Sequence, residues 1–518
     1  MNQHHALTVL TRLAGRRPDE AWKLEHALRG RVRRLADDVL TVAIETGDPI
    51  GRVFNKLLRE DQAPELSASL LERIPKDTVA LRELAATVTE QALGALETDP
   101  DLSANERKRK TVSARLDLSV RLSQIGERQR AYEVTKEAID DLTEDGELSK
   151  QQRDLLLGRA FGELSTCLSD LGKHEDSLAA AEKSVEIRRV LAAEGTRERR
   201  GELALSLSLE AASRTGVGDR QEAAQRGKEA VGIYEELAQE DSARYRHLLA
   251  GALSKLGTFE IELGDAESGV AMAGRALDIF RRLADRDSDA FTFHVAANAN
   301  NLANNLSLLR RFEDALPYAR EAADAFAILT SARPNAFGQY HAISLNTLSN
   351  RLNDLGKTEE ALEAARESVA VLRSLFQSNP GAFDVAFGRS LHTFAYRLVE
   401  SQKWDEALRA IDEVIVLRRR LTAENEQAAG TSLAMSLAIK SSALKGSGKL
   451  DAACDAVSEA LQQLNRVARL LGDALEREAR EIGGRYVQWH ELAERPVDSD
   501  ALEELKTLTK VDELGQIS

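Results

Sequence analysis

Apolar residues recur at intervals of three and four positions along most of the chain. The clearest stretch is residues 345–376, where Leu345, Leu348, Leu352 and Leu355 fall on one side of a helix with 3.6 residues per turn. Gly356 follows, and glycine suits the positive φ with which a helix ends and the chain turns back. A second apolar stripe begins after it. The stretch therefore predicts a helical hairpin.

The hairpin pattern returns with a fixed spacing of 46 residues. We call the residues equivalent to Gly356 the turn markers, and six of the eight are glycine: Gly126, Gly172, Gly218, Gly264, Arg310, Gly356, Gln402 and Gly448. A constant period of this size is typical of a repeat array. Eight copies cover residues 102–469, and two short turns per period leave about 19–20 residues, or roughly 30 Å, for each helix.

Small residues mark the places where helices are expected to come close. Five positions after each marker stand Ala131, Ser177, Ala223, Gly269, Ala315, Ala361, Ala407 and Ala453. Seven positions further stand Ala138, Ser184, Ala230, Ala276, Ala322, Ser368, Val414 and Ala460. Packing explains both columns without any chemistry. Pro334 and Pro380, also 46 residues apart, suit the first turn of the next hairpin.

The order Leu348, Ser349, Leu352, Gly356, Ala361, Ser368 and Pro380 resembles the tetratricopeptide repeat. The departures are the longer period and leucine in place of the usual aromatic residues, as in long-repeat bacterial members of this family. The resemblance implies an all-α, right-handed superhelical solenoid of eight hairpins. A HEAT-like array has a similar period and is the alternative, but it does not explain the small-residue column beside the turn.

The two ends depart from the period but still read as helical. Residues 1–101 are expected to form an N-terminal helical domain with helices at 19–44, 50–59, 65–74 and 77–96, covering one end of the array. Residues 470–518 are expected to form a C-terminal cap, with a polar helix at 470–483, a short helix at 486–492 and a last turn or two at 501–508.

The composition fits a soluble helical protein with ample length for an extended core. The chain is 43% hydrophobic, 30% charged and 4% aromatic, with a net charge of −15. The acidic balance argues against a nucleic-acid-binding surface as the main function. The two cysteines, Cys167 and Cys454, fit a reducing compartment. Because the sequence shows neither an 18-residue apolar run nor an export signal, we expect a cytoplasmic location and no membrane contact.

A search for catalytic chemistry in the sequence returns nothing. HExxH, GxSxG, paired CxxC and dinucleotide-binding glycine motifs do not occur. The tract Gly446-Ser447-Gly448-Lys449 lacks the earlier glycine and the following Ser or Thr of a phosphate-binding loop. The nine histidines make no metal-ligand spacing with another His, Cys or acid. We therefore expect a protein that is not an enzyme and holds no metal and no cofactor.

The N-terminal segment is locally basic within an acidic protein. Its basic residues are Arg12, Arg16, Arg17, Lys23, Arg29, Arg31, Arg33 and Arg34, against Asp19, Glu20 and Glu25. Arg29, Arg31, Arg33 and Arg34 are a candidate docking patch for an acidic partner, for nucleic acid or for the array of a second copy. The alternative is a solvated helix face.

Polar residues recur at two fixed positions within the first helix of each hairpin. Ten positions before the marker stand Gly162, Ser208, Ser254, Asn300, Asn346, His392 and Ala438, and six positions before it stand Thr166, Ala212, Thr258, Asn304, Asn350, Tyr396 and Ser442. The two columns are four residues apart and share one helix face, which we call the polar face. Asparagine is disfavoured inside helices, so its recurrence here calls for a reason.

Two explanations are possible for the recurrence of asparagine on this face. A side-chain amide both donates and accepts hydrogen bonds, so Asn300, Asn304, Asn346 and Asn350 could hold an extended peptide, with Asn353, His392 and Tyr396 nearby. The tetratricopeptide resemblance supports this, because related repeats use groove asparagines to hold peptides. Alternatively, the amides link neighbouring hairpins. The basic residues Lys255 and Lys445 are too few to capture a free carboxylate terminus.

Together these observations predict a non-enzymatic scaffold or adaptor that binds an extended segment of another protein. The alternative is a sensor of a peptide or small ligand whose superhelix changes on binding. The resemblance to long-repeat bacterial proteins further implies a regulator or peptidase substrate in a bacterial antiviral defence or signalling system. Its expected partners are a caspase-like peptidase or an NTPase of the same system.

Overall fold

The computed structural model describes residues 3–16, 21–46, 49–61, 63–71, 73–74, 81–143, 148–378, 380–424 and 426–511, and these residues form helices and short connections without any β-strand. The N-terminal helices are α1 (Gln3–Arg16), α2 (Ala21–Leu28), α3 (Val32–Thr46), α4 (Ile50–Asp61), α5 (Pro64–Leu71) and α6 (Arg82–Thr98). The C-terminal elements are the 3₁₀ helix η2 (Gly472–Leu475), α23 (Glu476–Leu492) and α24 (Ser499–Thr509).

Between these ends, helices follow one another in pairs. The pairs are α7 (Ala104–Gln124) with α8 (Arg128–Thr143), α9 (Lys150–Asp170) with α10 (His174–Ala192), α11 (Arg197–Gly216) with α12 (Arg220–Glu240), α13 (Ser242–Glu262) with α14 (Ala266–Ala284), α15 (Ser288–Leu308) with α16 (Phe312–Ala332), α17 (Pro334–Asp354) with α18 (Thr358–Ser378), α19 (Pro380–Glu400) with α20 (Trp404–Glu424), and α21 (Glu426–Gly446) with α22 (Leu450–Leu471). The first helix of a pair carries the polar face. The all-α architecture predicted from the sequence is confirmed.

Every turn marker adopts a positive φ. The six glycines have φ between 70° and 91°, and Arg310 and Gln402 adopt the same region at 57° and 56°. Around Gly356, the Lys357 amide donates to the Leu352 carbonyl at 2.9 Å, and Lys403 repeats this bond to Leu398 after Gln402. These bonds satisfy carbonyls that the helix end leaves free. The predicted turn is therefore present even where the marker is not glycine.

The small-residue columns lie where helices meet. All members of both columns are buried. Gly269 on α14 shows why a small residue is needed, because a Cβ there would lie 2.5 Å from the Gly257 carbonyl oxygen of α13 and 2.4 Å from Ile261 Cγ1. The close approach of two backbones thus excludes even a methyl group at this position.

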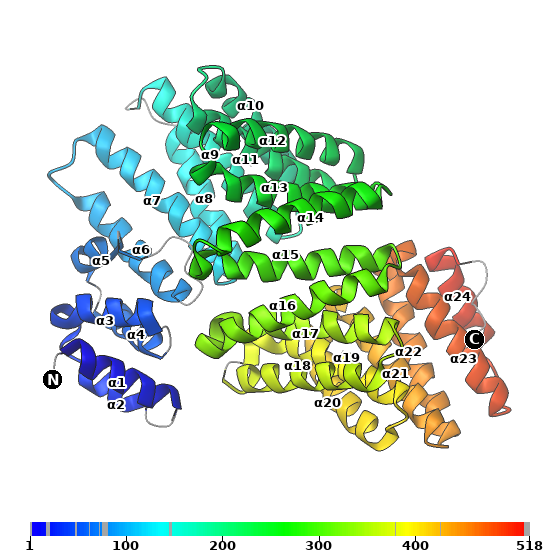
Figure 1. Ribbon diagram of the computed structural model, residues 1–518. Coiled ribbons are helices and arrows are strands. Elements are labelled where there is room, and N and C mark those ends of the chain that lie inside the picture. Colours follow the sequence, from blue (N-terminus) through cyan, green and yellow to red (C-terminus); the bar gives the residue numbers. More distant parts are fainter. Residues whose placement is uncertain are drawn as a thin grey trace. The chain divides into compact units, whose positions relative to one another are not determined.

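Contacts divide the chain into two compact units: residues 1–309 with 331–336, and residues 310–330 with 337–518. In the first unit, α9 to α14 pack each against the next (Figure 1). α6 packs against α7, and Arg121 Nη1 of α7 donates to the Ala85 carbonyl at 2.8 Å. The predicted boundaries at 101 and 469 remain predictions.

The N-terminal helix expected over residues 19–44 is interrupted. The structure forms α2 and α3 instead, and Gly30 stands between them with φ at 73°. Glycine readily adopts this left-handed conformation, which ends a helix. Because the apolar periodicity continues across Gly30, the sequence pattern gave no sign of the break.

The second unit ends in helices that cover α22. Both α23 and α24 pack against α22, with Trp489 and Tyr486 buried and Trp489 Nε1 donating to Ser441 Oγ at 3.4 Å. The boundaries expected here were wrong, because α22 ends at Leu471 before Gly472, at φ 59°. A single helix, α23, then includes most of the two segments expected at 470–483 and 486–492.

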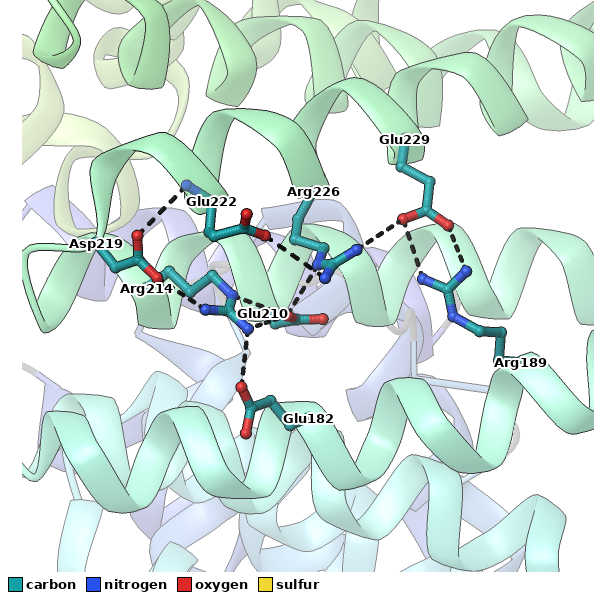
Figure 2. A network of polar contacts seen from close by, with 8 residues as sticks. All are labelled: Glu182, Arg189, Glu210, Arg214, Asp219, Glu222, Arg226 and Glu229. Carbon is teal, nitrogen blue, oxygen red and sulfur yellow. Dashed lines mark hydrogen bonds and ion pairs between the residues drawn. The ribbon is translucent and has the colours of Figure 1, made fainter.

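An ionic network ties α10, α11 and α12 together in the first unit (Figure 2). Buried Glu210 accepts hydrogen bonds through Oε1 from Arg214 Nε at 2.8 Å and from Arg226 Nε at 3.1 Å. Arg214 also contacts Glu182 and Asp219, each at 2.8 Å. Because its charges belong to several helices, the network fixes the register between neighbouring pairs.

Candidate functional site

The predicted site residues of the second unit lie on α17 and α19. Asn346 on α17 is 8% exposed, and its Nδ2 donates to Ser390 Oγ on α19 at 2.9 Å. Ser390 Oγ lies 2.7 Å from Ser368 Oγ on α18, and Ser368 donates to the Ala342 carbonyl at 2.9 Å. Asn346 therefore links neighbouring helix pairs, which was the structural alternative for these asparagines.

The same hydrogen-bond chain fixes which way the Asn346 amide points. The Ala342 carbonyl can only accept, so Ser368 uses its proton there and accepts from Ser390. Ser390 has then used its own proton and can only accept from Asn346 Nδ2. The Oδ1 atom of Asn346 consequently points away from this chain, and it is buried without a hydrogen-bond partner among the described residues.

A small pocket opens beside Asn346 between α17, α18 and α19. Its volume is about 100 Å³, enough for several waters or the end of one side chain. The buried residues Asn346, Leu372 and Ser390 line it together with the exposed Gln339, Val385 and Arg389. The pocket thus combines apolar side chains with the polar residues Gln339, Ser390 and Arg389.

A second group of polar residues lies one turn further along the same helices. Arg397 of α19 donates through Nη2 to Asn350 Oδ1 of α17 at 2.9 Å and pairs with Glu400. Asn353 Nδ2 donates to Glu400 Oε1 at 3.2 Å. Asn350 and Asn353 therefore also bridge α17 and α19, while remaining partly accessible.

Tyr396 presents the most accessible aromatic ring of the predicted site. It is 36% exposed, and the Arg397 guanidinium lies over its ring, 5.1 Å from the centroid. Its environment raises the pKa of the phenol, chiefly by desolvation. The ring is thus held by a cation on one side and keeps a protonated hydroxyl.

The side chain of His392, in contrast, contacts other side chains of the second unit. Its Nδ1 lies 3.0 Å from Arg418 Nη1 of α20, and Arg418 also donates to the Ser432 carbonyl and Ser436 Oγ of α21. Burial, together with the Arg418 charge, lowers the pKa of His392 to about 3. Burial also lowers the pKa of Arg418 to about 10. The neutral imidazole acts as an acceptor for Arg418.

In the first unit, the predicted residues lie on α15. Asn304 is exposed, and Asn300 is partly buried. The Oδ1 atom of Asn300 is buried without a hydrogen-bond partner among the residues that the structure describes, as is the equivalent atom of Asn346. One repeat position therefore leaves an amide oxygen unpaired in each unit.

The candidate docking patch in the N-terminal segment is partly neutralised. Arg29 contacts Glu25 at 2.5 Å and Glu60 at 3.1 Å, and Arg33 contacts Asp61 at 3.1 Å. Arg31 and Arg34 are exposed. Arg16, in the same basic segment, is the last residue of α1, and its side chain is not among those that the structure describes. Arg17 lies outside the described residues.

Other features considered for chemistry take structural positions. Cys167 and Cys454 are buried free thiols whose pKa is raised by burial. Among the described residues, no three His, Cys, Asp or Glu side chains are grouped so that they could hold a metal ion. No described helix is both long and apolar enough to span a membrane. Gly448, within the loop-like tract, is the turn marker between α21 and α22.

Four arginines were not predicted for this region. Arg397 and Arg351 both stand five positions before their markers, so their spacing was a signal that sequence reasoning could have used. Arg389 and Arg418 have no such repeat within the second unit. Their proximity to Asn346 and His392 emerges only from the packing of α19 against α17 and α20.

Comparison with known proteins agrees with this architecture. Residues 341–380 match the Tetratricopeptide repeat family profile. No curated protein sequence matches the chain significantly. The region matched by the profile is the pair α17 and α18, which contributes Asn346 and Leu372 to the pocket.

Solved structures also align with this chain, and one of them, RapI, resembles it in fold. Apo RapI is 15% identical, with 79% of this chain aligned to 99% of that chain and a TM-score of 0.51. BtubC (BKLC) from P. vanneervenii is 23% identical, with 48% of this chain aligned to 92% of that chain and a TM-score of 0.40. A Rap protein complexed with competence and sporulation factor is 14% identical, with 76% aligned to 99% and a TM-score of 0.40.

The match to the repeat profile lies within a chain whose paired helices, turn markers and buried small-residue columns continue at the same spacing on both sides of it. The similarity to RapI extends over most of both chains. Residues 341–380 are therefore similar to a tetratricopeptide repeat, and the chain shares its all-α fold with RapI.

Proposed function

We propose that this protein binds a segment of another protein along the polar faces of its first helices. The observation that carries the proposal is the set of accessible polar side chains on these helices, Asn304 in the first unit and Asn350, Asn353 and Tyr396 in the second. Side-chain amides and a phenol can both donate hydrogen bonds to a partner segment and accept them from it.

The accessible side chains on the polar faces suit a neutral, polar partner. Asn304 is exposed, Asn350 and Asn353 are partly accessible, and Tyr396 offers an aromatic ring. Arg397 is held by Glu400 and Asn350, so its charge is largely compensated. Recognition would depend on hydrogen bonds and ring contacts, and salt would weaken it little.

We infer that the protein acts by binding and not by catalysis. A cysteine nucleophile requires an accessible thiolate with a lowered pKa, whereas both thiols here are buried with a raised pKa. His392, the most central histidine of the predicted site, holds its imidazole toward Arg418. A scaffold or adaptor role accounts for the arrangement without bond chemistry.

Selection of random displayed peptides on the full-length protein would test this function. Peptides enriched on the wild type should lose affinity for Tyr396→Ala and for Asn304→Ala, which alter exposed groups at little cost to folding. Glu363→Ala and Glu367→Ala, two exposed positions on α18 outside the predicted columns, are the matched controls. If every variant binds the peptides equally, the polar faces are not the binding surface, and Arg31 with Arg34 becomes the next surface to test.

The identity of the natural partner rests on the family resemblance. We propose a caspase-like peptidase or an NTPase encoded with this protein in a bacterial defence or signalling system. Co-purification of the protein with each neighbouring gene product, compared between wild type and Tyr396→Ala, would test this. A partner retained only by the wild type supports the proposal, and failure of all such products to bind rejects it.

A further inference from the structure

Two arginines of the first unit return in the second unit at the same repeat positions. Arg159 on α9 and Arg188 on α10 stand five periods of 46 residues before their counterparts, Arg389 on α19 and Arg418 on α20. In each unit the first arginine is at least partly accessible, and the second is buried. The surroundings of the two pairs can therefore be compared position by position.

Three carboxylates surround the pair in the first unit. Asp117 Oδ1 of α7 accepts a hydrogen bond from Arg159 Nη2 at 2.5 Å. Glu202 of α11 pairs with Arg188 at 2.5 Å. Burial raises the pKa of Glu163 on α9, and the neighbouring Arg159 and Arg188 charges oppose that rise. The charge of both arginines is thus balanced within the first unit.

In the second unit, residues with a hydroxyl group stand at all three carboxylate positions. The residues at the positions of Asp117, Glu163 and Glu202 are, in that order, Thr347, Thr393 and Ser432. Neither Arg389 nor Arg418 forms an ion pair with a carboxylate among the residues that the structure describes. Arg418 donates instead to neutral acceptors, namely the His392 ring, the Ser436 hydroxyl and two backbone carbonyls.

This arrangement leaves uncompensated positive charge at an accessible place. Burial lowers the pKa of Arg418 to about 10, and the neighbouring Arg389 charge adds to that shift. Arg389 is exposed, and so is Ser432 at the position of Glu202. A buried charge is costly without a counter-ion. An anion beside Arg389 would therefore stabilise both guanidinium groups.

The first unit also indicates which anion fits. Side-chain carboxylates take the equivalent places there, and their two oxygens match the N–H groups of a guanidinium. Leu372 and Val385, which line the pocket beside Arg389, suit the methylene groups of such a side chain. We propose that an acidic side chain of the partner segment binds at Arg389, next to the buried Arg418. The inference rests on the proposed function and adds one charged residue to a segment that is otherwise neutral.

Amino acids blocked at both ends test the side chain apart from a chain terminus. The probes are the N-acetyl methylamides of glutamate and glutamine, which have the same length and differ in charge, with inorganic phosphate as a third. They would be titrated into the full-length chain labelled at Leu and Val methyl groups, and the resonances of Leu372 and Val385 would report binding. We expect the glutamate probe to bind about five-fold more tightly than the glutamine probe, and phosphate to bind more weakly than glutamate.

Matched variants distinguish this site from the charge of the protein in general. Arg389→Gln should remove the preference for glutamate, whereas Arg159→Gln, at the same repeat position of the first unit, should leave it unchanged. Ser432→Glu installs the carboxylate of Glu202 at an exposed position and should also remove the preference. Ser374→Glu, exposed on α18, adds the same charge elsewhere and should retain it. If Ser432→Glu does not fold, Arg389→Gln decides.

Several outcomes would overturn the inference. Equal binding of the glutamate and glutamine probes, or no detectable binding of glutamate, would reject a carboxylate site. Tighter binding of phosphate would assign the site to a free oxyanion. Loss of the preference in Arg159→Gln as well as in Arg389→Gln would show that net charge decides.

Failure of this inference can be told from failure of the proposed function. If displayed peptides bind but carry no acidic residue, the proposed function stands and this inference fails. If the glutamate probe binds as expected while no peptide is selected, the carboxylate site stands and the proposed function fails.

Discussion

Asn346 Nδ2 on α17 lies 2.9 Å from Ser390 Oγ on α19, and this bond joins two helix pairs while it orients the amide that lines the pocket. Replacing Ser390 with alanine removes an acceptor for Asn346 and a donor to Ser368. We expect the free energy of unfolding to fall by about 1–3 kcal/mol, measured by urea denaturation. Thr393→Ala, which removes a hydroxyl bonded within α19, should cost less than half as much.

The two glycines of α14 should respond in opposite directions to alanine. Gly269→Ala places a methyl group against the Gly257 carbonyl and Ile261, and we expect a loss of about 1–3 kcal/mol. Gly274 lies in the same helix with nothing within 4 Å of an added Cβ, so Gly274→Ala should gain up to about 1 kcal/mol from helix propensity. Equal effects in thermal unfolding would show that close approach of α13 and α14 is not what selects glycine at 269.

Glycine should stabilise a turn marker at which another residue stands. Gln402 has φ at 56°, a region that costs an L-residue about 1–2 kcal/mol. Gln402→Gly should therefore raise the free energy of unfolding by about 0.5–1 kcal/mol, with the entropy of the unfolded glycine offsetting the remainder. Gly356→Ala is the reciprocal control and should lower it by about 1 kcal/mol.

His392 should make the protein less stable in acid. Its pKa falls from the ordinary 6.5 to about 3 on folding, so the unfolded chain binds its proton first as the pH falls. The stabilisation is complete above pH 6.5 and is lost progressively between pH 6.5 and pH 3, by about 2 kcal/mol at pH 5. His392→Gln should reduce this loss between pH 7 and pH 5.

Urea denaturation of wild type and His392→Gln at the two pH values measures this difference. His174→Gln, at an exposed position on α10, serves as the control and should retain the wild-type loss. If His392→Gln loses as much stability as the wild type, the contact with Arg418 does not depend on a neutral imidazole.

The repeating parts of the fold could be predicted from the sequence, because each repeat has the same pattern of apolar residues, turn marker and small residues. The turn at Gln402 could be placed from its spacing alone, although glutamine gives no turn signal. The break at Gly30 and the helix end at Gly472 could not be placed, because each occurs once and interrupts an apolar pattern that continues past it. Local periodicity does not report such single events.

The candidate site was predicted less completely than the fold. Spacing placed Asn346 and Asn350 on one helix face, and their helix-breaking character indicated a special role. It did not reveal that Asn346 is buried against Ser390 or that Arg389 lies at the same pocket, because these contacts join α17 and α19 across 43 or more residues. Orientation of the amide depends on a chain of hydrogen bonds that only packed helices supply.

The central claim, that a partner segment lies on the polar face, is tested most directly by photo-crosslinking. A photoreactive phenylalanine analogue would replace Tyr396 in one sample and Val416, 70% exposed on α20 and outside the predicted columns, in another. Each sample would be irradiated with a peptide selected on the wild type. The account predicts a covalent adduct from position 396 and none from position 416. Adducts from 416 alone would place the partner on another surface and contradict the account.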